Sequence, residues 1–381
     1  MRSTSSTSSR VRAGLTAALA VGVLLGGCST GAAPTDDTGG GRSAPAPSAS
    51  SPSGATGSAT VPASPPSSEP TRAIPEASGP SPSRVPSSPA APDPASIAAL
   101  IATKFEGGGL RLGAERGSTS AYRQYFASYR SNGLTISGRI NVPRGKGPFP
   151  AVVLAHGYVD PAVYANGETM LRERDHLARQ GYVTLHIDYR NHAQSSRDPD
   201  NDARLRAGYT IDAINAGLAL KQSSLVDPSR VALIGRSMGG GVVYNTLVVR
   251  PGLFRAAVAY APVSSDTVDN FNTWVRRDAS RAGAARSVIA RLGTPEAQPA
   301  RWAATSPRTY FSRITEPLLI HHGTADEDCP IAWSRESVAA LEAKGKNVQL
   351  YVYPGGRHTL TSPQWDTSIR RTEAFLEQHL T

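Results

Sequence analysis

The chain has 381 residues, with 40 Lys and Arg against 30 Asp and Glu, and it contains only two cysteines. Two cysteines cannot form a disulfide framework, and the fold must therefore depend on a hydrophobic core. The formal net charge of +10 comes mainly from arginine, and we interpret it as the bias of a solvated surface. The sequence shows no internal repeat, no Cys/His metal cluster and no nucleic-acid-binding motif. We therefore do not expect a repeat protein, a Cys/His metal site or a nucleic-acid-binding protein.

The N-terminus has the pattern of a processing signal. Arginines at positions 2, 10 and 12 precede an apolar run, Ala13 to Leu25, that is too short to span a bilayer comfortably. This pattern predicts a signal peptide over residues 1–27. A cysteine directly after Leu25-Gly26-Gly27 resembles the bacterial lipobox, which implies that Cys28 is lipidated and anchors an extracytoplasmic protein to the cell membrane. An ordinary secreted protein with an incidental cysteine is the alternative.

Residues 28–94 are dominated by Ser, Pro, Ala, Gly and Thr and contain almost no large apolar residues. Such a segment cannot bury enough surface to offset the entropy of ordering it, so we predict a disordered tether. Residues 95–381 remain for one large domain.

Within that domain, strand-like and helix-like patterns alternate. The expected strands are Tyr122 to Tyr129, Leu134 to Val142, Ala151 to Ala155, Tyr182 to Ile187, Val231 to Ile234, Ala256 to Tyr260, Leu318 to His321 and Val348 to Tyr353. The expected helices are Glu168 to Gln180, Gly208 to Gln222, Val242 to Val249, Val338 to Lys344 and Ile369 to His379. The first two strands should form a hairpin through Asn132-Gly133. Short apolar strands between helices predict a mainly parallel sheet covered on both faces.

The alternation breaks between Pro262 and Pro317. Apolar residues there, such as Trp274 and Val288, are spaced as in helices. We therefore expect a small helical insertion over residues 263–316 that lies over the active site as a lid, with a plain extended connection as the alternative.

The most informative segment is Gly235-Arg236-Ser237-Met238-Gly239. It follows an apolar strand and precedes a helix, which is the strand, nucleophile elbow and helix of an α/β-hydrolase. Ser237 would be the nucleophile on a strained turn, and Gly235 and Gly239 would remove side chains that clash there.

A serine nucleophile needs a base and an acid that orients the base. Asp326 follows one apolar strand and His358 follows the next, so both fall on loops at the same edge of the sheet. The chain order Ser, Asp, His is the order that this fold requires. Glu327, Asp328 and Asp266 are rival candidates for the acid.

The oxyanion hole needs two converging N–H groups. Met238 follows the nucleophile and should supply one. The loop after Ala155 begins His156-Gly157-Tyr158, and we expect the second donor to be the N–H of Tyr158, with Gly157 as the alternative. His156 and His322 end strands, and we expect them to be structural or to support the catalytic residues, not to act as bases.

The segment Asp198 to Asp202 resembles the start of a calcium loop. However, Ala203 stands where the loop needs glycine and Tyr209 where it needs glutamate, so we interpret it as a solvated loop. No metal or cofactor is expected.

Taken together, the motifs resemble the catalytic domain of the prolyl oligopeptidase (S9) family within the α/β-hydrolases. The matching residues are Gly235-Arg236-Ser237-Met238-Gly239-Gly240, His156-Gly157, Asp188-Tyr189-Arg190, His322-Gly323-x-x-Asp326 and His358 next to its glycines. This resemblance implies Ser237 as nucleophile, Asp326 as acid and His358 as base, over roughly residues 120–381.

The set is also similar to dienelactone hydrolases and actinobacterial polyester esterases. We expect a serine hydrolase acting on a peptide or, alternatively, an ester, and keep a non-catalytic wall-binding module as the third hypothesis.

Overall fold

The computed structural model describes residues 92–381. The signal peptide expected over residues 1–27, the lipidation site Cys28 and the tether up to residue 91 lie outside the described residues. The described residues belong to one compact unit.

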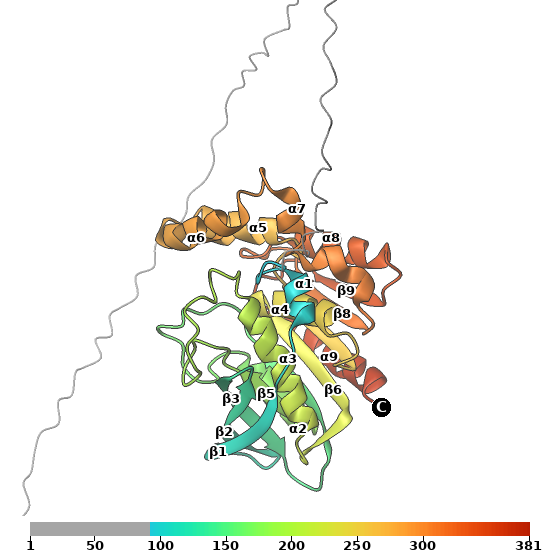
Figure 1. Ribbon diagram of the computed structural model, residues 1–381. Coiled ribbons are helices and arrows are strands. Elements are labelled where there is room, and N and C mark those ends of the chain that lie inside the picture. The colour runs from blue at the N-terminus through green and yellow to red at the C-terminus, as the bar shows by residue number, and fades with distance from the viewer. Residues whose placement is uncertain (1–91) are drawn as a thin grey trace, which may run out of the picture. The chain divides into compact units, whose positions relative to one another are not determined.

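Among the described residues, nine strands form one sheet (Figure 1). They are β1 (Gly108–Ser118), β2 (Tyr122–Ser131), β3 (Leu134–Pro143), β4 (Phe149–Ala155), β5 (Val183–Ile187), β6 (Val226–Arg236), β7 (Ala256–Tyr260), β8 (Leu318–Gly323) and β9 (Val348–Tyr353). The α-helices are α1 (Ile97–Ala102), α2 (Leu171–Arg179), α3 (Ala207–Lys221), α4 (Met238–Val249), α5 (Thr267–Phe271), α6 (Ala282–Leu292), α7 (Pro299–Ala303), α8 (Ile331–Glu342) and α9 (Gln364–His379).

The sheet changes from antiparallel to parallel across its width. Its strand order is β1-β2-β3-β5-β4-β6-β7-β8-β9. The pairs β1/β2, β2/β3 and β3/β5 are antiparallel, and every pair from β5 to β9 is parallel. Parallel neighbours need crossover connections, which the helices supply. The carboxyl ends of β4, β6, β8 and β9 therefore meet at one edge, where a doubly wound sheet places its site.

The expected hairpin between β2 and β3 is confirmed. Asn132 and Gly133 form its turn with φ of 47° and 82°. Positive φ at both central residues is what a type I′ turn requires, and its twist suits paired strands.

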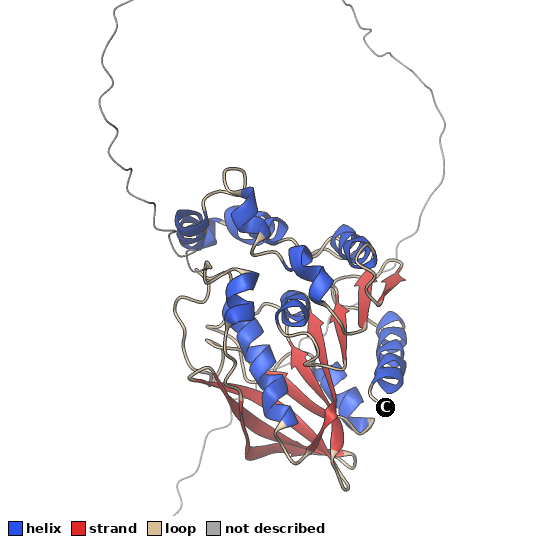
Figure 2. Cartoon of the chain, turned by 45° about the vertical axis from the view of Figure 1, so that its right-hand side comes forward, coloured by secondary structure: helices blue, strands red, loops and turns tan. Residues whose placement is uncertain are grey.

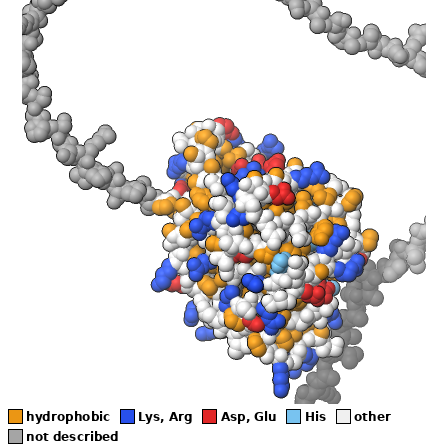
Figure 3. Space-filling model, turned by 90° about the vertical axis from the view of Figure 1, so that its right-hand side faces the viewer, with side chains coloured by type: hydrophobic (Ala, Val, Ile, Leu, Met, Phe, Trp, Pro, Cys, Tyr) orange, Lys and Arg blue, Asp and Glu red, His pale blue; other side chains and the backbone are white. Residues whose placement is uncertain are grey.

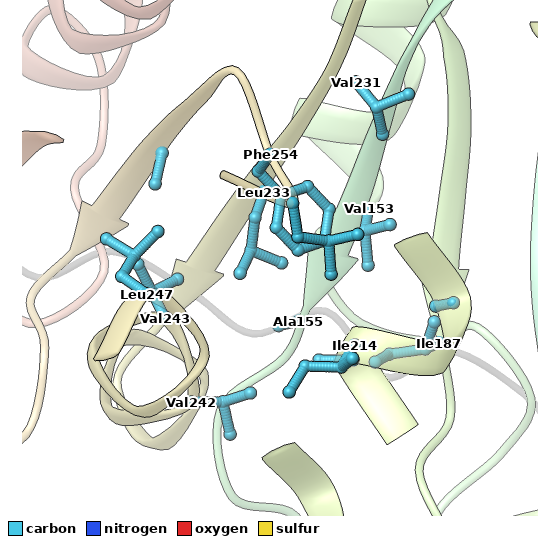
Figure 4. Packing of buried hydrophobic residues seen from close by; sticks show 14 of the residues in the cluster. Val153, Ala155, Ile187, Ile214, Val231, Leu233, Val242, Val243, Leu247 and Phe254 are labelled. Atoms are coloured by element: carbon cyan, nitrogen blue, oxygen red, sulfur yellow. The ribbon is translucent and has the colours of Figure 1, made fainter. Parts of the chain in front are cut away.

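The two faces of the sheet bury alternate residues of each central strand. In β6, Val231 and Leu233 pack into the core under α3 and α4, whereas Ala232 and Ile234 face the core that contains Leu177 of α2 and the α9 side chains. Figure 4 shows the first of these cores, and Figure 2 shows helices on both sides of the strands. The expected sheet, covered on both faces, is confirmed.

Several boundaries differ from the predictions. The short helix α1 and the edge strand β1 were not expected. Helix α4 begins at Met238 instead of Val242, because the glycine run after Met238 has weak helix propensity and hides the true start. Helix α8 begins at Ile331 instead of Val338, and α9 at Gln364 instead of Ile369.

The segment between β7 and β8 is helical, and we call residues 263–316 the insertion. It contains α5, α6 and α7 together with the short turns η1 (Asn272–Arg276), η2 (Ala279–Arg281) and η3 (Pro307–Arg313). Its side chains form a core of their own around Phe271, Leu292 and Trp302. Figure 1 shows α5, α6 and α7 in a layer beyond one end of the sheet.

The face drawn in Figure 3 mixes basic, acidic and apolar side chains. Within residues 92–381, none of the helices combines the length and apolar character needed to cross a bilayer.

Candidate active site

Ser237 lies between the end of β6 and the start of α4 in a strained backbone conformation with positive φ. Its φ is 55° and its ψ is −119°. Such angles are costly for a residue with a side chain and persist only where the surroundings enforce them. The Ser237 N–H donates to the carbonyl of Tyr260 at 2.9 Å, and the Ser237 carbonyl accepts from the N–H of Gly240 at 2.9 Å and of Val263 at 3.2 Å.

Glycines make this turn sterically possible. A Cβ on Gly239 would lie 1.9 Å from the carbonyl oxygen of Ala155, and one on Gly235 would lie 2.1 Å from the carbonyl oxygen of Gly239. Neither overlap can be relieved by a side-chain rotation, because both contacts are with backbone atoms. The elbow therefore requires glycine at both positions.

Asp326 and His358, which are 32 residues apart, are in direct contact. His358 Nδ1 lies 3.0 Å from each carboxylate oxygen of Asp326. Asp326 follows β8 and His358 follows β9, and these strands are parallel neighbours. Their adjacency in the sheet brings the two loops together, as the sequence predicted.

The Asp326 side chain is buried and is surrounded by donors. The N–H groups of Asp328 and Cys329 donate to it at 2.9 and 2.8 Å, and His322 Nε2 lies 3.1 Å from Oδ2. Burial alone would raise the pKa of Asp326, but the hydrogen bonds from His322, His358 and Cys329 outweigh it and hold the pKa well below its usual range. The carboxylate is therefore ionised at neutral pH.

His322, expected from the sequence to be structural or to support the catalytic residues, lies beside Asp326. Its Nδ1 lies 2.7 Å from the Ser334 hydroxyl, which can donate to it and leave the ring proton on Nε2. Nε2 lies 2.9 Å from the carbonyl oxygen of Cys329 and 3.1 Å from Oδ2 of Asp326. The buried N–H of His322 is thus shared between the Cys329 carbonyl and the carboxylate that His358 contacts. The tandem His321-His322 at the end of β8 was the only signal for it.

Ser237 and His358 line the same cavity, which has a volume of about 950 Å³. Gly157 and Tyr158 also line it, as do Phe271 and other side chains of the insertion. Within residues 92–381, the hydrogen bonds of His358 are with Asp326 and Glu327, and none joins it to Ser237 in this conformation.

The loop after β4 lies against Ser237. A Cβ on Gly157 would be 3.1 Å from Ser237 Cβ and 3.7 Å from its Oγ, so this loop approaches the serine closely. Met238 is the first residue of α4, where an N–H has no partner within the helix. The residues expected to form an oxyanion hole are thus adjacent to Ser237.

Buried aromatic rings hold this loop from inside the protein. His156 Nδ1 lies 2.5 Å from the carbonyl of Gly157, and His192 Nε2 lies 3.2 Å from the carbonyl of Val159. The His156 ring stacks on Tyr164 with 4.8 Å between centroids. Burial, with a smaller effect of His192, lowers the pKa of His156 to about 4, so this ring is neutral at neutral pH. His156 is therefore suited to support the loop.

The rival acids have other partners. Glu327 accepts from the His358 N–H at 3.1 Å and pairs with Arg357, while Asp266 caps α5 by accepting from Val268 at 2.9 Å. Asp328 lies 3.8 Å from His358 Nε2, but it does not contact Nδ1.

In the loop that resembles a calcium site, the first aspartate forms ion pairs with arginines. Asp198 pairs with Arg190 at 2.8 Å and with Arg204 at 2.6 Å. Within the described part of the chain, no group of three or more His, Cys, Asp or Glu side chains could hold a metal ion.

One charged pair near the site was missed by sequence reasoning. Arg236, beside the serine, pairs with the buried carboxylate of Glu173 on α2, and Trp365 of α9 donates to the same carboxylate at 3.1 Å. Since the partners are more than 60 residues apart, no local pattern could have indicated the contact.

Comparisons with known proteins agree with this architecture. The model of the prolyl oligopeptidase family matches residues 151–381. The protein named Uncharacterized peptidase YuxL, from Bacillus subtilis (strain 168), is 26% identical over 268 residues, which cover 65% of this chain and 38% of that protein. The chain spans between 28% and 38% of the length of the first three curated relatives that it matches.

Solved structures show the same fold. The acylaminoacyl peptidase of Pyrococcus horikoshii has a TM-score of 0.57 at 20% identity and covers 68% of this chain and 42% of its own. Acetyl xylan esterase 1 from Thermoanaerobacterium sp. JW/SL YS485 has a TM-score of 0.58 at 18% identity and covers 75% of this chain and 94% of its own. The α/β-hydrolase prediction is confirmed, and with a family model that matches most of its described residues, the chain belongs to the prolyl oligopeptidase family.

Proposed function

We propose that the chain is a serine peptidase that works through an acyl-enzyme on Ser237. The observation that carries the proposal is the contact of His358 with a buried, ionised Asp326, on the wall of the cavity that also exposes Ser237. The family model and the peptidase names of the relatives support a peptide substrate.

In this mechanism His358 is the general base. Its Nδ1–H is held by Asp326, which leaves Nε2 free to take the proton of Ser237 as the hydroxyl attacks the carbonyl carbon. The ionised carboxylate of Asp326 stabilises the imidazolium that forms. His358 then returns the proton to the leaving group, and the same base activates the water that hydrolyses the acyl-enzyme.

The negative charge on the carbonyl oxygen needs donors that are already in place. We assign the N–H of Met238 and the N–H of Tyr158 to this role, with Gly157 as the alternative to Tyr158. A single donor of this kind is worth roughly 10²–10³ in kcat. The insertion contributes Phe271 and Trp274 to the cavity wall, and we assign it the role of a lid that limits substrate size and excludes water.

An esterase is the second candidate. It is favoured by the acetyl xylan esterase likeness, which extends over 94% of that chain. Ester and amide cleavage use the same triad and oxyanion hole, so the difference between them lies in the cavity wall and the insertion.

For localisation we propose a lipid anchor at Cys28. The charged n-region, the short apolar run and Leu25-Gly26-Gly27-Cys28 support it. Two acyl chains give stable attachment, at about 0.8 kcal/mol for each buried CH₂ group. The Ser- and Pro-rich composition of residues 28–94 suits a spacer between the anchor and the catalytic domain.

Ser237→Ala should abolish labelling by a fluorophosphonate and lower kcat by roughly 10⁴–10⁶-fold, since the covalent step is lost. Ser224→Ala, which removes an exposed serine hydroxyl outside the cavity wall, serves as the control. Intact-protein mass spectrometry and turnover of an activated ester measure both effects. Labelling that persists in Ser237→Ala would refute the nucleophile assignment.

Matched p-nitroanilide and p-nitrophenyl ester substrates with the same acyl group decide between peptidase and esterase. A peptidase should cleave the aminoacyl anilides with a measurable kcat/KM that Ser237→Ala eliminates. Ester turnover with no detectable anilide turnover over a panel of acyl groups would establish the second candidate instead.

Asp326→Asn should lower kcat by roughly 10⁴-fold, because the base loses its orienting carboxylate. It should also destabilise the fold in a pH-dependent way. A carboxyl whose pKa is depressed in the folded state stabilises the protein above its unfolded pKa, about 3.9, and this contribution is lost as the pH falls further through the folded value. Urea unfolding should therefore show a constant difference between wild type and variant above about pH 5 that shrinks below about pH 4.

The same substitution at Asp200, whose side chain is 77% exposed, is the control for that experiment. A wild-type advantage that grows as the pH falls from 5 to 3 would contradict the account of Asp326.

Cys28→Ser should prevent lipidation, so that the protein leaves the membrane fraction or is misprocessed while the catalytic domain stays active. Membrane fractionation and metabolic labelling with a fatty-acid probe measure this. Wild-type protein that is soluble in the medium, with an unmodified N-terminus elsewhere, would rule out the anchor.

A further inference from the structure

Tyr158 belongs to the proposed oxyanion loop, and its side chain contacts two arginines, Arg206 and Arg281. Tyr158 is 41% exposed, so its side chain is not held by core packing. Instead, the guanidinium carbons of Arg206 and Arg281 each lie over the ring at 4.6 Å from its centroid. Both distances are within the range of a cation–π interaction.

The two arginines come from different parts of the fold. Arg206 immediately precedes α3, which packs on the sheet, and Arg281 ends the turn η2 of the insertion. Tyr158 therefore joins the sheet-bound part of the domain to the insertion. The contact lies one residue from Gly157, which approaches Ser237.

Each guanidinium is fixed by its own anchors. Arg206 Nε donates to Asp202 at 2.9 Å. Arg281 Nη1 donates to the carbonyl of Trp274 at 3.1 Å, and its Nε lies 3.4 Å from Asp278. The planar groups are thus oriented before they meet the ring, and less freedom is lost on contact.

Arg206 also reaches the other proposed oxyanion donor. Its Nη1 lies 3.7 Å from the sulfur of Met238. One arginine therefore touches the side chains of both residues whose N–H groups are assigned to the oxyanion hole.

We propose that Arg206 and Arg281 are positioning residues that hold the N–H of Tyr158 toward the oxyanion, and that Arg281 makes this geometry depend on the docked insertion. The inference rests on the proposed function. The loop of residues 156–160 has no regular secondary structure, so its outer side needs such contacts, while His156 and His192 hold its inner side. Displacement of a catalytic group by about 1 Å can cost roughly 10²-fold in rate.

The test is a double-mutant cycle on kcat for an activated ester. Arg281→Ala should lower kcat about ten- to a hundredfold with KM changed less than about threefold, since the lost interaction acts in the transition state. Arg281→Lys should recover part of the loss, because an ammonium also stacks on an aromatic ring. In a Tyr158→Ala background, Arg281→Ala should change kcat less than about twofold, because the ring through which it acts is gone.

Arg276→Ala is the matched control within the insertion. This arginine pairs with Glu296 at 2.5 Å and lies outside the cavity wall, so kcat should stay at the wild-type value. An equal loss from Arg281→Ala in both backgrounds would overturn the proposal. So would a raised KM at unchanged kcat, which would mean that Arg281 binds substrate only.

Hydrogen exchange gives a readout that does not depend on turnover. A peptide covering residues 157–163 should exchange faster in Arg281→Ala than in wild type and Arg276→Ala, and unchanged exchange would overturn the proposal. Wild-type protein that neither turns over esters nor reacts at Ser237 would instead refute the proposed function, and the exchange result would still decide whether Arg281 holds the loop.

Discussion

The strained backbone at Ser237 is the constraint on which the rest of the site depends. The turn exists only because three backbone segments meet there without side chains between them. Gly239 approaches the carbonyl of Ala155 so closely that a Cβ would lie 1.9 Å away. The same approach brings the loop after β4 against the serine and the N-terminus of α4 behind it. The backbone of this turn places the serine on the cavity wall.

Burial raises the pKa of Asp326 and lowers the pKa of His156, so it favours the neutral form of both side chains. Asp326 is buried but remains ionised, because donors on His322, His358 and Cys329 outweigh the cost of desolvation. His156 is buried without a carboxylate partner, and its pKa falls to about 4. His358, unlike His156, has a carboxylate partner that can stabilise its protonated form. The partners of each ring thus determine its role: His358 is suited to act as the base, and His156 to support the loop after β4.

Much of the fold could be predicted because apolar strands bounded by turns are recognisable locally. Strands β7 and β9 begin and end where the sequence indicated. The meeting of Asp326 and His358 followed from parallel strand ends sharing an edge. Contacts across the chain could not be foreseen, and the pairs of Arg281 with Tyr158 and of Glu173 with Arg236 are examples. They depend on how the insertion and α2 pack, which no periodicity encodes.

The central claim is that Ser237 and His358 act as one unit, and non-additivity tests it most directly. The rate of acyl transfer to water should be measured for Ser237→Ala, His358→Ala and the double variant under the same conditions. If the residues form one proton-relay unit, the double variant should be no slower than either single variant, apart from about a twofold difference. Independent losses that multiply in the double variant would contradict the account.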